Sequence, residues 1–174
     1  MLVTELGQHL QVASQEEAVA LTGMDKRFWN VISIYGTSSP RPLLRFAASV
    51  HHACFDDIEA APYDGGARPA ALDVLEAAFQ FADGVGRAPL LIHCRMGLSR
   101  SAGVMLGWLH RRIGGGSDAP MKALEILLRV RPRAVPNELV VRLGLQLSMP
   151  AAEAAALARM LVNDPRVLAN RPQG

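Results

Sequence analysis

The chain has 174 residues, of which half are apolar, and a formal net charge of +2. A chain of this size can bury one core without disulfides or a metal, so we expect a single domain. The small net charge excludes the strong positive field that nucleic-acid binding usually requires, and no nucleic-acid partner is expected. No segment reaches the roughly 20 consecutive apolar residues of a membrane span, and no secretory signal is visible, so we expect a cytoplasmic protein with no membrane partner.

The two cysteines, Cys54 and Cys94, are too few for a disulfide framework, which favours a reducing compartment. His51 and His52 lie close to Cys54 in the sequence, but the cluster resembles part of one strand more than a tetrahedral metal site. We therefore expect no metal and no other cofactor. The alanine- and arginine-rich composition favours a bacterial source.

Three apolar segments have the length and composition of strands. Residues 28–36 are rich in β-branched and aromatic residues, and residues 45–55 are followed by the pair Asp56 and Asp57. Residues 88–94 form a shorter apolar run that ends at a cysteine. Residues 28–36 predict a buried strand, and the other two segments are candidate strands.

Apolar residues at helical spacing predict helices in the remaining segments, namely 69–86, from 101 onward, 121–130, 137–147 and an alanine-rich stretch in the tail. Strands that alternate with helices predict an α/β fold, in which helices flank a central, mostly parallel sheet. We expect residues 1–150 to form the main domain and residues 151–174 to form a C-terminal helix and tail packed on it. Ligands of such sheets bind beyond the carboxyl ends of the strands.

The segment PLLIHCRMGLSRSAGVMLGW, residues 89–108, combines a strand, a tight loop and a helix. Backbone N–H groups of a loop at a helix N-terminus converge on one point, where the helix dipole also favours negative charge. Gly97 permits a tight cradle, and the planar guanidinium of Arg100 can hold two oxygens of one phosphoryl group. Helix N-termini and nearby cations also favour the thiolate of a cysteine. Cys94 is therefore predicted to be a nucleophile, and the alternative is a small buried thiol.

The motif HCRMGLSRS resembles the His-Cys-x5-Arg-Ser/Thr signature of the protein tyrosine phosphatase superfamily, and its form is similar to the compact, dual-specificity-like bacterial branch. The matching positions are His93, Cys94, Gly97, Arg100 and Ser101. The segments VISIYG and RPRAVPN and the acidic pair resemble weaker landmarks of that branch. The resemblance implies a phosphatase with a phosphocysteine intermediate, in which Ser101 hydrogen-bonds the sulfur and His93 supports the loop from behind.

The loop residues predicted to bind phosphate are Arg95, Met96, Gly97, Leu98, Ser99 and Arg100. Arg95 either faces the substrate or is a solvated surface arginine. Met96 and Leu98 shape the rim or pack underneath. The expected partner is a substrate, either a phosphorylated protein or a small phosphoester. In a protein the phosphate would be carried by tyrosine and also by serine or threonine. The oligomeric state stays open.

A proton donor for the leaving oxygen is expected on a loop upstream of the cysteine. The resemblance favours Asp57, with Asp56 second and Asp64 third, and Asp64 also fits a turn before two glycines. Neighbouring residues of a strand point to opposite faces, so at most one of the adjacent pair should reach the site.

Other residues carry weaker expectations. Cys54 is either a structural thiol or a resolving partner for an oxidised Cys94, and Asn137 is predicted to be a helix N-cap. Several arginines are expected on solvated helix faces and termini: Arg111, Arg112, Arg129, Arg131 and Arg133. Two other functions remain open, a rhodanese-like sulfurtransferase and a non-catalytic phosphate-binding module.

Overall fold

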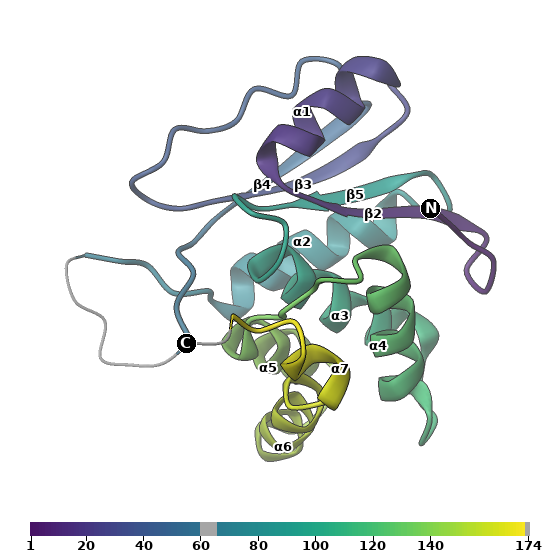
Figure 1. Cartoon of the computed structure of the whole chain (residues 1–174), viewed down its shortest axis with the longest axis vertical. Coiled ribbons are helices and arrows are strands. Elements are labelled where there is room, and N and C mark those ends of the chain that lie inside the picture. Colours follow the sequence, from purple (N-terminus) through teal and green to yellow (C-terminus); the bar gives the residue numbers. More distant parts are fainter. Residues whose placement is uncertain (60–65, 173–174) are drawn as a thin grey trace.

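The computed structural model describes residues 1–59 and 66–172. The elements within these ranges are β1 (Leu2–Val3), β2 (Gln8–Ala13), α1 (Gln15–Met24), β3 (Asn30–Tyr35), β4 (Ser49–Cys54), α2 (Leu72–Gly84), β5 (Leu90–His93), α3 (Arg100–Ile113), α4 (Ala119–Val130), α5 (Glu138–Gln146), α6 (Ala151–Val162) and α7 (Pro165–Leu168). The last strand, β5, ends at His93, and most of the helices follow it in the chain (Figure 1).

The strands form one sheet in the order β1-β2-β5-β3-β4. β2, β5, β3 and β4 run parallel, and β1 pairs antiparallel with β2 at one edge. All four residues of β5 are buried, as expected of a strand between two parallel neighbours with both faces covered. The predicted α/β fold with a mostly parallel sheet is confirmed.

Helices cover the two faces of the sheet unequally (Figure 1). On one face α1 packs over a small core that contains Ala18, Trp29 and Val31. On the other face the remaining helices bury a larger core, in which Phe79 of α2 and Trp108 of α3 are fully buried. Single parallel strands supply both cores because successive side chains point to opposite faces.

The larger core continues from α3 to the C-terminal helices. α3 and α5 cross closely, since a Cβ on Gly107 would lie 3.2 Å from the Cα of Gly144. α6 adds Ala154, Ala158 and Leu161 to the same core. None of the helices in the described ranges combines the length and the apolar character needed to span a bilayer.

The elements before residue 28 were not predicted. β2 follows an alternating pattern of burial, and α1 mixes apolar and polar residues around its circumference, which hides its helical period. The missed signal is a capping box: the Ser14 side chain accepts from the Glu17 N–H at 3.1 Å, and the Glu17 carboxylate accepts from the Ser14 N–H at 2.6 Å. The strand predicted over 45–55 begins only at Ser49, because a turn precedes it in which the Ala47 N–H donates to the Leu44 carbonyl.

Candidate active site

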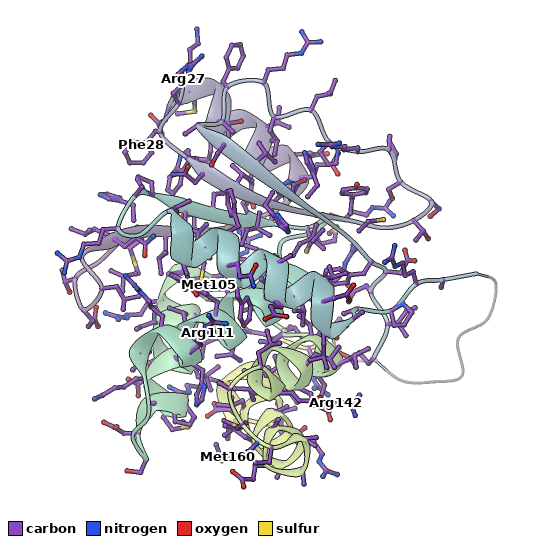
Figure 2. All side chains as sticks on the ribbon, turned by 180° about the vertical axis from the view of Figure 1, so that it is seen from behind. Arg27, Phe28, Met105, Arg111, Arg142 and Met160 are labelled. Carbon is purple, nitrogen blue, oxygen red and sulfur yellow. The ribbon has the colours of Figure 1, made fainter. Side chains whose placement is uncertain are left out.

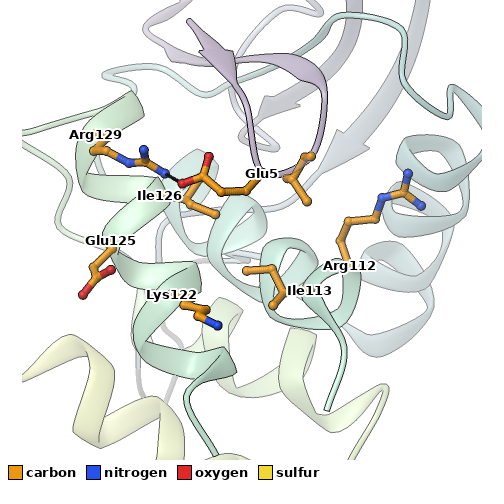
Figure 3. Close-up of a pocket in the computed structure, with 8 residues that line it drawn as sticks. Glu5, Arg112, Ile113, Lys122, Glu125, Ile126 and Arg129 are labelled. Atoms are coloured by element: carbon orange, nitrogen blue, oxygen red, sulfur yellow. Dashed lines mark hydrogen bonds and ion pairs between the residues drawn. The ribbon is translucent and has the colours of Figure 1, made fainter. Parts of the chain in front are cut away.

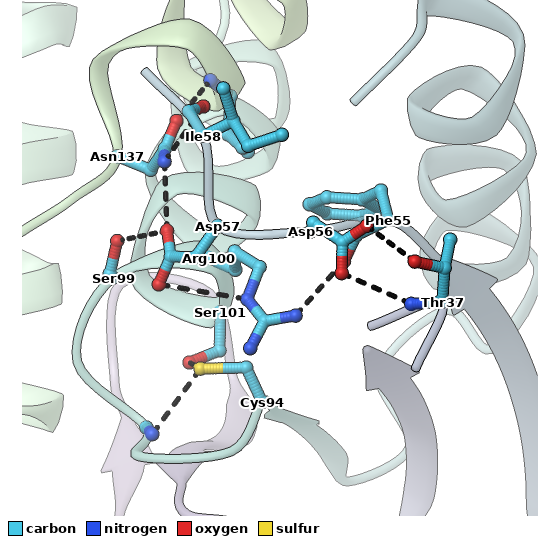
Figure 4. Close-up of polar contacts among 12 residues, drawn as sticks. Thr37, Phe55, Asp56, Asp57, Ile58, Cys94, Ser99, Arg100, Ser101 and Asn137 are labelled. Atoms are coloured by element: carbon cyan, nitrogen blue, oxygen red, sulfur yellow. Dashed lines mark hydrogen bonds and ion pairs between the residues drawn. The ribbon is translucent and has the colours of Figure 1, made fainter. Parts of the chain in front are cut away.

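The segments that follow β4 and β5 both leave the sheet at the end where the parallel strands have their carboxyl termini. β5 ends at His93, which is in register with Ser33 of the intervening β3, and β4 ends at Cys54. The loop that begins at Cys94 and the segment that begins at Phe55 therefore leave the sheet side by side (Figure 4). Parallel sheets bind ligands at this end, beyond the carboxyl termini of their strands.

The Cys94 sulfur lies at the base of its loop and is almost fully buried. Its Sγ is 3.1 Å from the Ser101 Oγ and accepts a hydrogen bond from the Gly97 N–H at 3.3 Å (Figure 4). α3 starts at Arg100 without a side-chain cap, so its first-turn N–H groups keep their partial positive charge for an anion. The contact between Ser101 and the sulfur is the one that the resemblance implies.

Gly97 allows the loop to pack against the junction of β2 and α1. Its φ is +69°, in the left-handed region that favours glycine. A Cβ at this position would lie 2.3 Å from the carbonyl carbon of Ala13 and 2.4 Å from the nitrogen of Ser14. A larger residue would therefore displace the loop from the sheet.

Arg100 is 7 % exposed, and one nitrogen of its guanidinium is held by a hydrogen bond. Its Nη1 donates to the Phe55 carbonyl at 2.9 Å. Its Nε is buried and has no hydrogen-bond partner within the described residues, since the Asp57 Oδ2 is 3.7 Å away. A buried donor without a partner costs on the order of 1–3 kcal/mol, and a bound oxyanion would satisfy it.

Asp57 lies at the rim of this loop. Its Oδ1 accepts hydrogen bonds from the Ser99 Oγ at 2.7 Å and from the Asn137 Nδ2 at 2.9 Å (Figure 4). Asn137 also accepts from the Val140 N–H at 3.0 Å, which confirms the predicted N-cap of α5. The contact between Asn137 and Asp57 was not predicted, because 80 positions separate the two residues.

Asp56 bonds residues outside the Cys94 loop, although β4 ends at Cys54 and strand alternation no longer applies to the acidic pair. Its carboxylate accepts from the Arg68 N–H at 2.8 Å and from Thr37 through the backbone N–H at 3.1 Å and the hydroxyl at 2.7 Å. These bonds, that from the Arg68 N–H foremost, hold the pKa of Asp56 below its ordinary value. Asp56 is thus ionised, and its carboxylate oxygens already accept hydrogen bonds from Thr37 and Arg68. Asp64 lies outside the described residues.

His93 is completely buried beneath the loop. Burial lowers the pKa of its imidazole from 6.5 to about 4, so the ring is neutral at neutral pH. Neither ring nitrogen has a hydrogen-bond partner within the described residues, so the supporting role that the resemblance implies stays a prediction.

Acidification from pH 6.5 toward 4 should lower the free energy of unfolding, because the unfolded chain protonates His93 before the folded chain does. The contribution of His93 is fully present above its unfolded pKa, and it falls by at most about 1.4 kcal/mol per pH unit as pH drops toward the folded pKa. Urea denaturation at several pH values measures this slope. His93→Gln should flatten it by about one proton, whereas the exposed His9→Gln should not. Equal slopes in all three proteins would contradict the expectation.

Cys54 cannot reach Cys94. β3 lies between their two strands, so two inter-strand spacings place these segments roughly 10 Å apart, beyond the Cα separation that a disulfide spans. The alternative that Cys54 is a resolving partner for Cys94 is therefore wrong. Cys54 is a half-buried free thiol.

The expectation of solvated arginines is confirmed for Arg111 (Figure 2) and Arg129, which are exposed although each makes an ion pair, and it is wrong for Arg131. Arg111 pairs with Asp83 at 2.9 Å, and Arg129 pairs with Glu5. Arg131 is only 20 % exposed in its side chain and bonds to the loop of Cys94.

Surface cavities lie both beside the loop of Cys94 and away from it. One of about 270 Å³ opens beside Arg100 and is lined by Tyr35, Glu16 and Arg95, while Met96 is 63 % exposed at the loop. Arg95 thus faces the approach to the site. A larger cavity of about 430 Å³ lies between the β1–β2 turn, the end of α3 and α4, and it contains none of the predicted site residues (Figure 3).

Comparisons with known proteins bear on the fold of the chain. No protein-family model matches the chain, and no curated protein sequence matches it. Human DUSP28 superposes with a TM-score of 0.61 at 19% identity, over 87% of this chain and 94% of that chain. DUSP15 gives 0.58 at 21% identity, over 90% and 92%. The Yvh1 phosphatase domain from Chaetomium thermophilum gives 0.57 at 23% identity, over 82% and 93%.

These structures are phosphatases by name, and each covers most of both chains. The resemblance predicted from the motif between His93 and Ser101 is therefore confirmed at the level of the fold. The chain has the fold of the dual-specificity branch of the protein tyrosine phosphatase superfamily.

Proposed function

We propose that the chain hydrolyses phosphate monoesters through a phosphocysteine intermediate on Cys94. The observation that carries this proposal is the grouping of three reactive side chains at one loop: the Cys94 sulfur, the unpartnered Nε of Arg100 and the carboxyl group of Asp57 (Figure 4). The first supplies a nucleophile, the second an oxyanion ligand and the third a proton.

In the first step the Cys94 thiolate attacks the phosphorus in line with the ester oxygen. The S–P bond forms, the P–O bond breaks, and Asp57 gives its proton to the leaving oxygen. Arg100 and the loop N–H groups stabilise the charge on the transferring phosphoryl group. Ser99 and Asn137 hold Asp57 at the rim, where a leaving group would pass.

In the second step water attacks the phosphocysteine. The carboxylate of Asp57 takes a proton from this water, the new O–P bond forms, and the S–P bond breaks. The sulfur leaves as a thiolate, and the Ser101 hydroxyl at 3.1 Å stabilises it by a hydrogen bond. Asp57 is then protonated again for the next cycle.

The proposed substrates are phosphorylated proteins, on phosphotyrosine and also on phosphoserine or phosphothreonine. The cavity beside Arg100 has the volume to admit part of a peptide side chain, and Arg95 and Tyr35 line it. A sulfurtransferase would leave Asp57 without a task, whereas two side chains hold this carboxylate toward Arg100.

Phosphate release with EDTA present tests this proposal. We expect the chain to hydrolyse an aryl phosphate and a tyrosine-phosphorylated peptide, and to form no thiocyanate from thiosulfate and cyanide. No phosphate release, strict metal dependence or sulfur transfer would contradict the proposal.

A further inference from the structure

The carbonyl groups of the loop between Cys94 and Arg100 are held from outside. Each backbone carbonyl of the five consecutive residues 95–99 accepts a hydrogen bond from another part of the chain. The Arg131 side chain donates to the carbonyls of Met96 at 3.4 Å and Gly97 at 3.0 Å. Backbone N–H groups donate to the other three: Gln15 to Arg95 at 3.2 Å, Val135 to Leu98 at 2.9 Å, and Gly103 and Asn137 to Ser99 at 2.8 and 3.3 Å. In a trans peptide group the C=O of one residue and the N–H of the next residue point in opposite directions. Carbonyls held outside therefore turn N–H groups inward, as the Gly97 N–H shows by donating to the Cys94 sulfur.

Arg131 is the one side chain among these donors within the described residues; the others are backbone groups. It lies at the end of α4, and its Nε and Nη2 bond the carbonyls of Gly97 and Met96. Its Nη1 donates to the Glu17 Oε1 at 3.1 Å. One planar guanidinium thus spans two adjacent carbonyls and a carboxylate, which a lysine ammonium cannot reproduce.

Glu17 fixes the direction of that guanidinium. Its other carboxylate oxygen accepts from the Ser14 N–H at 2.6 Å and closes the capping box of α1. Partial burial opposes ionisation, but the bonds from Ser14 and Arg131 keep the pKa of Glu17 below its ordinary value. The ionised carboxylate therefore ties the start of α1 to Arg131, and Arg131 to the loop.

We infer that Arg131 is a positioning residue for the anion-binding loop: it holds the Met96 and Gly97 carbonyls outward, so that the loop N–H groups face a bound phosphoryl group, and Glu17 orients it. Its importance for turnover rests on the proposed function, but its importance for anion binding does not. The sequence marks the segment RPRAVPN, which begins at Arg131, as a landmark of the resemblance, but it does not show that Arg131 contacts the loop.

Protection of Cys94 by inorganic phosphate tests this inference without any turnover. Iodoacetamide alkylation of the Cys94 peptide is followed by mass spectrometry at increasing phosphate concentration, in wild type, Arg131→Lys, Arg131→Gln and Glu17→Gln. Arg133→Gln is the matched control, because Arg133 is an exposed neighbour with no ion pair within the described residues. We expect the half-protecting phosphate concentration to rise about tenfold in both Arg131 variants, less in Glu17→Gln and not in the control.

The melting temperature of each variant separates positioning from folding. If Arg131→Gln does not fold, Arg131→Lys decides the matter, because it keeps the charge and loses the planar fork. Unchanged phosphate protection in a folded Arg131→Lys protein would overturn the inference, even if hydrolysis by the wild type supports the proposed function. Weaker protection in that variant would support the inference, even if the wild type hydrolyses no ester.

Discussion

Replacing Cys94 with serine should abolish phosphate release and leave phosphate binding in place. An alcohol is a far poorer nucleophile than a thiolate, and it leaves phosphorus less readily, so both chemical steps should fail. The loss in initial rate on an aryl phosphate should be on the order of 10⁴-fold or more. The binding groups are untouched, since Arg100 is anchored on the Phe55 carbonyl and the loop rests on Ala13.

Initial rates and calorimetric titration with inorganic phosphate check both halves of this expectation. Cys54→Ser is the matched control, because that thiol lies on the other side of β3 and should be dispensable for turnover. Substantial turnover by the Cys94→Ser protein would contradict the assignment of the nucleophile.

Asp57→Asn should lower turnover by about 10²- to 10⁴-fold, the range typical of a lost general acid. The amide keeps the hydrogen bonds of the carboxylate in part, but it has no proton to give. The loss should therefore be largest for phenyl or alkyl phosphates, whose leaving oxygens need protonation, and smallest for a nitrophenyl phosphate. Rates across such a leaving-group series measure this dependence.

Asp56→Asn is the matched comparison for this experiment. Asp56 bonds Thr37 and Arg68 and is ionised, so its replacement should loosen the end of β4 without creating a leaving-group dependence. If Asp56→Asn shows the steep dependence and Asp57→Asn does not, the two aspartates are assigned the wrong way round.

Much of the fold follows from local patterns. The apolar runs at β3 and β5 and the helical spacing in α2 and α3 each specify one element, and alternation of strands with helices specifies a parallel sheet. β2 and α1 were not predicted. For α1 the reason is that it lacks an apolar stripe and depends on its capping box and on contacts with the sheet.

The centre of the site could also be predicted, because the residues from His93 to Ser101 are contiguous and their spacing carries the chemistry. The supporting residues could not. Arg131 and Asn137 lie more than 30 positions after the loop, and although both belong to the landmark RPRAVPN, the segment does not show which residues they contact. The choice between Asp56 and Asp57 depends on which way the chain turns after β4, which only the structure shows.

Capture of the phosphorylated enzyme tests the central claim most directly. Wild type mixed with an aryl phosphate is quenched within one turnover, digested and analysed by mass spectrometry for a phosphoryl group. The mechanism predicts one phosphoryl group on the sulfur of Cys94 in the peptide that spans the loop, and none in the Cys94→Ser protein. A phosphoryl group on any other residue, or turnover with no phosphorylated enzyme at any quench time, would contradict it.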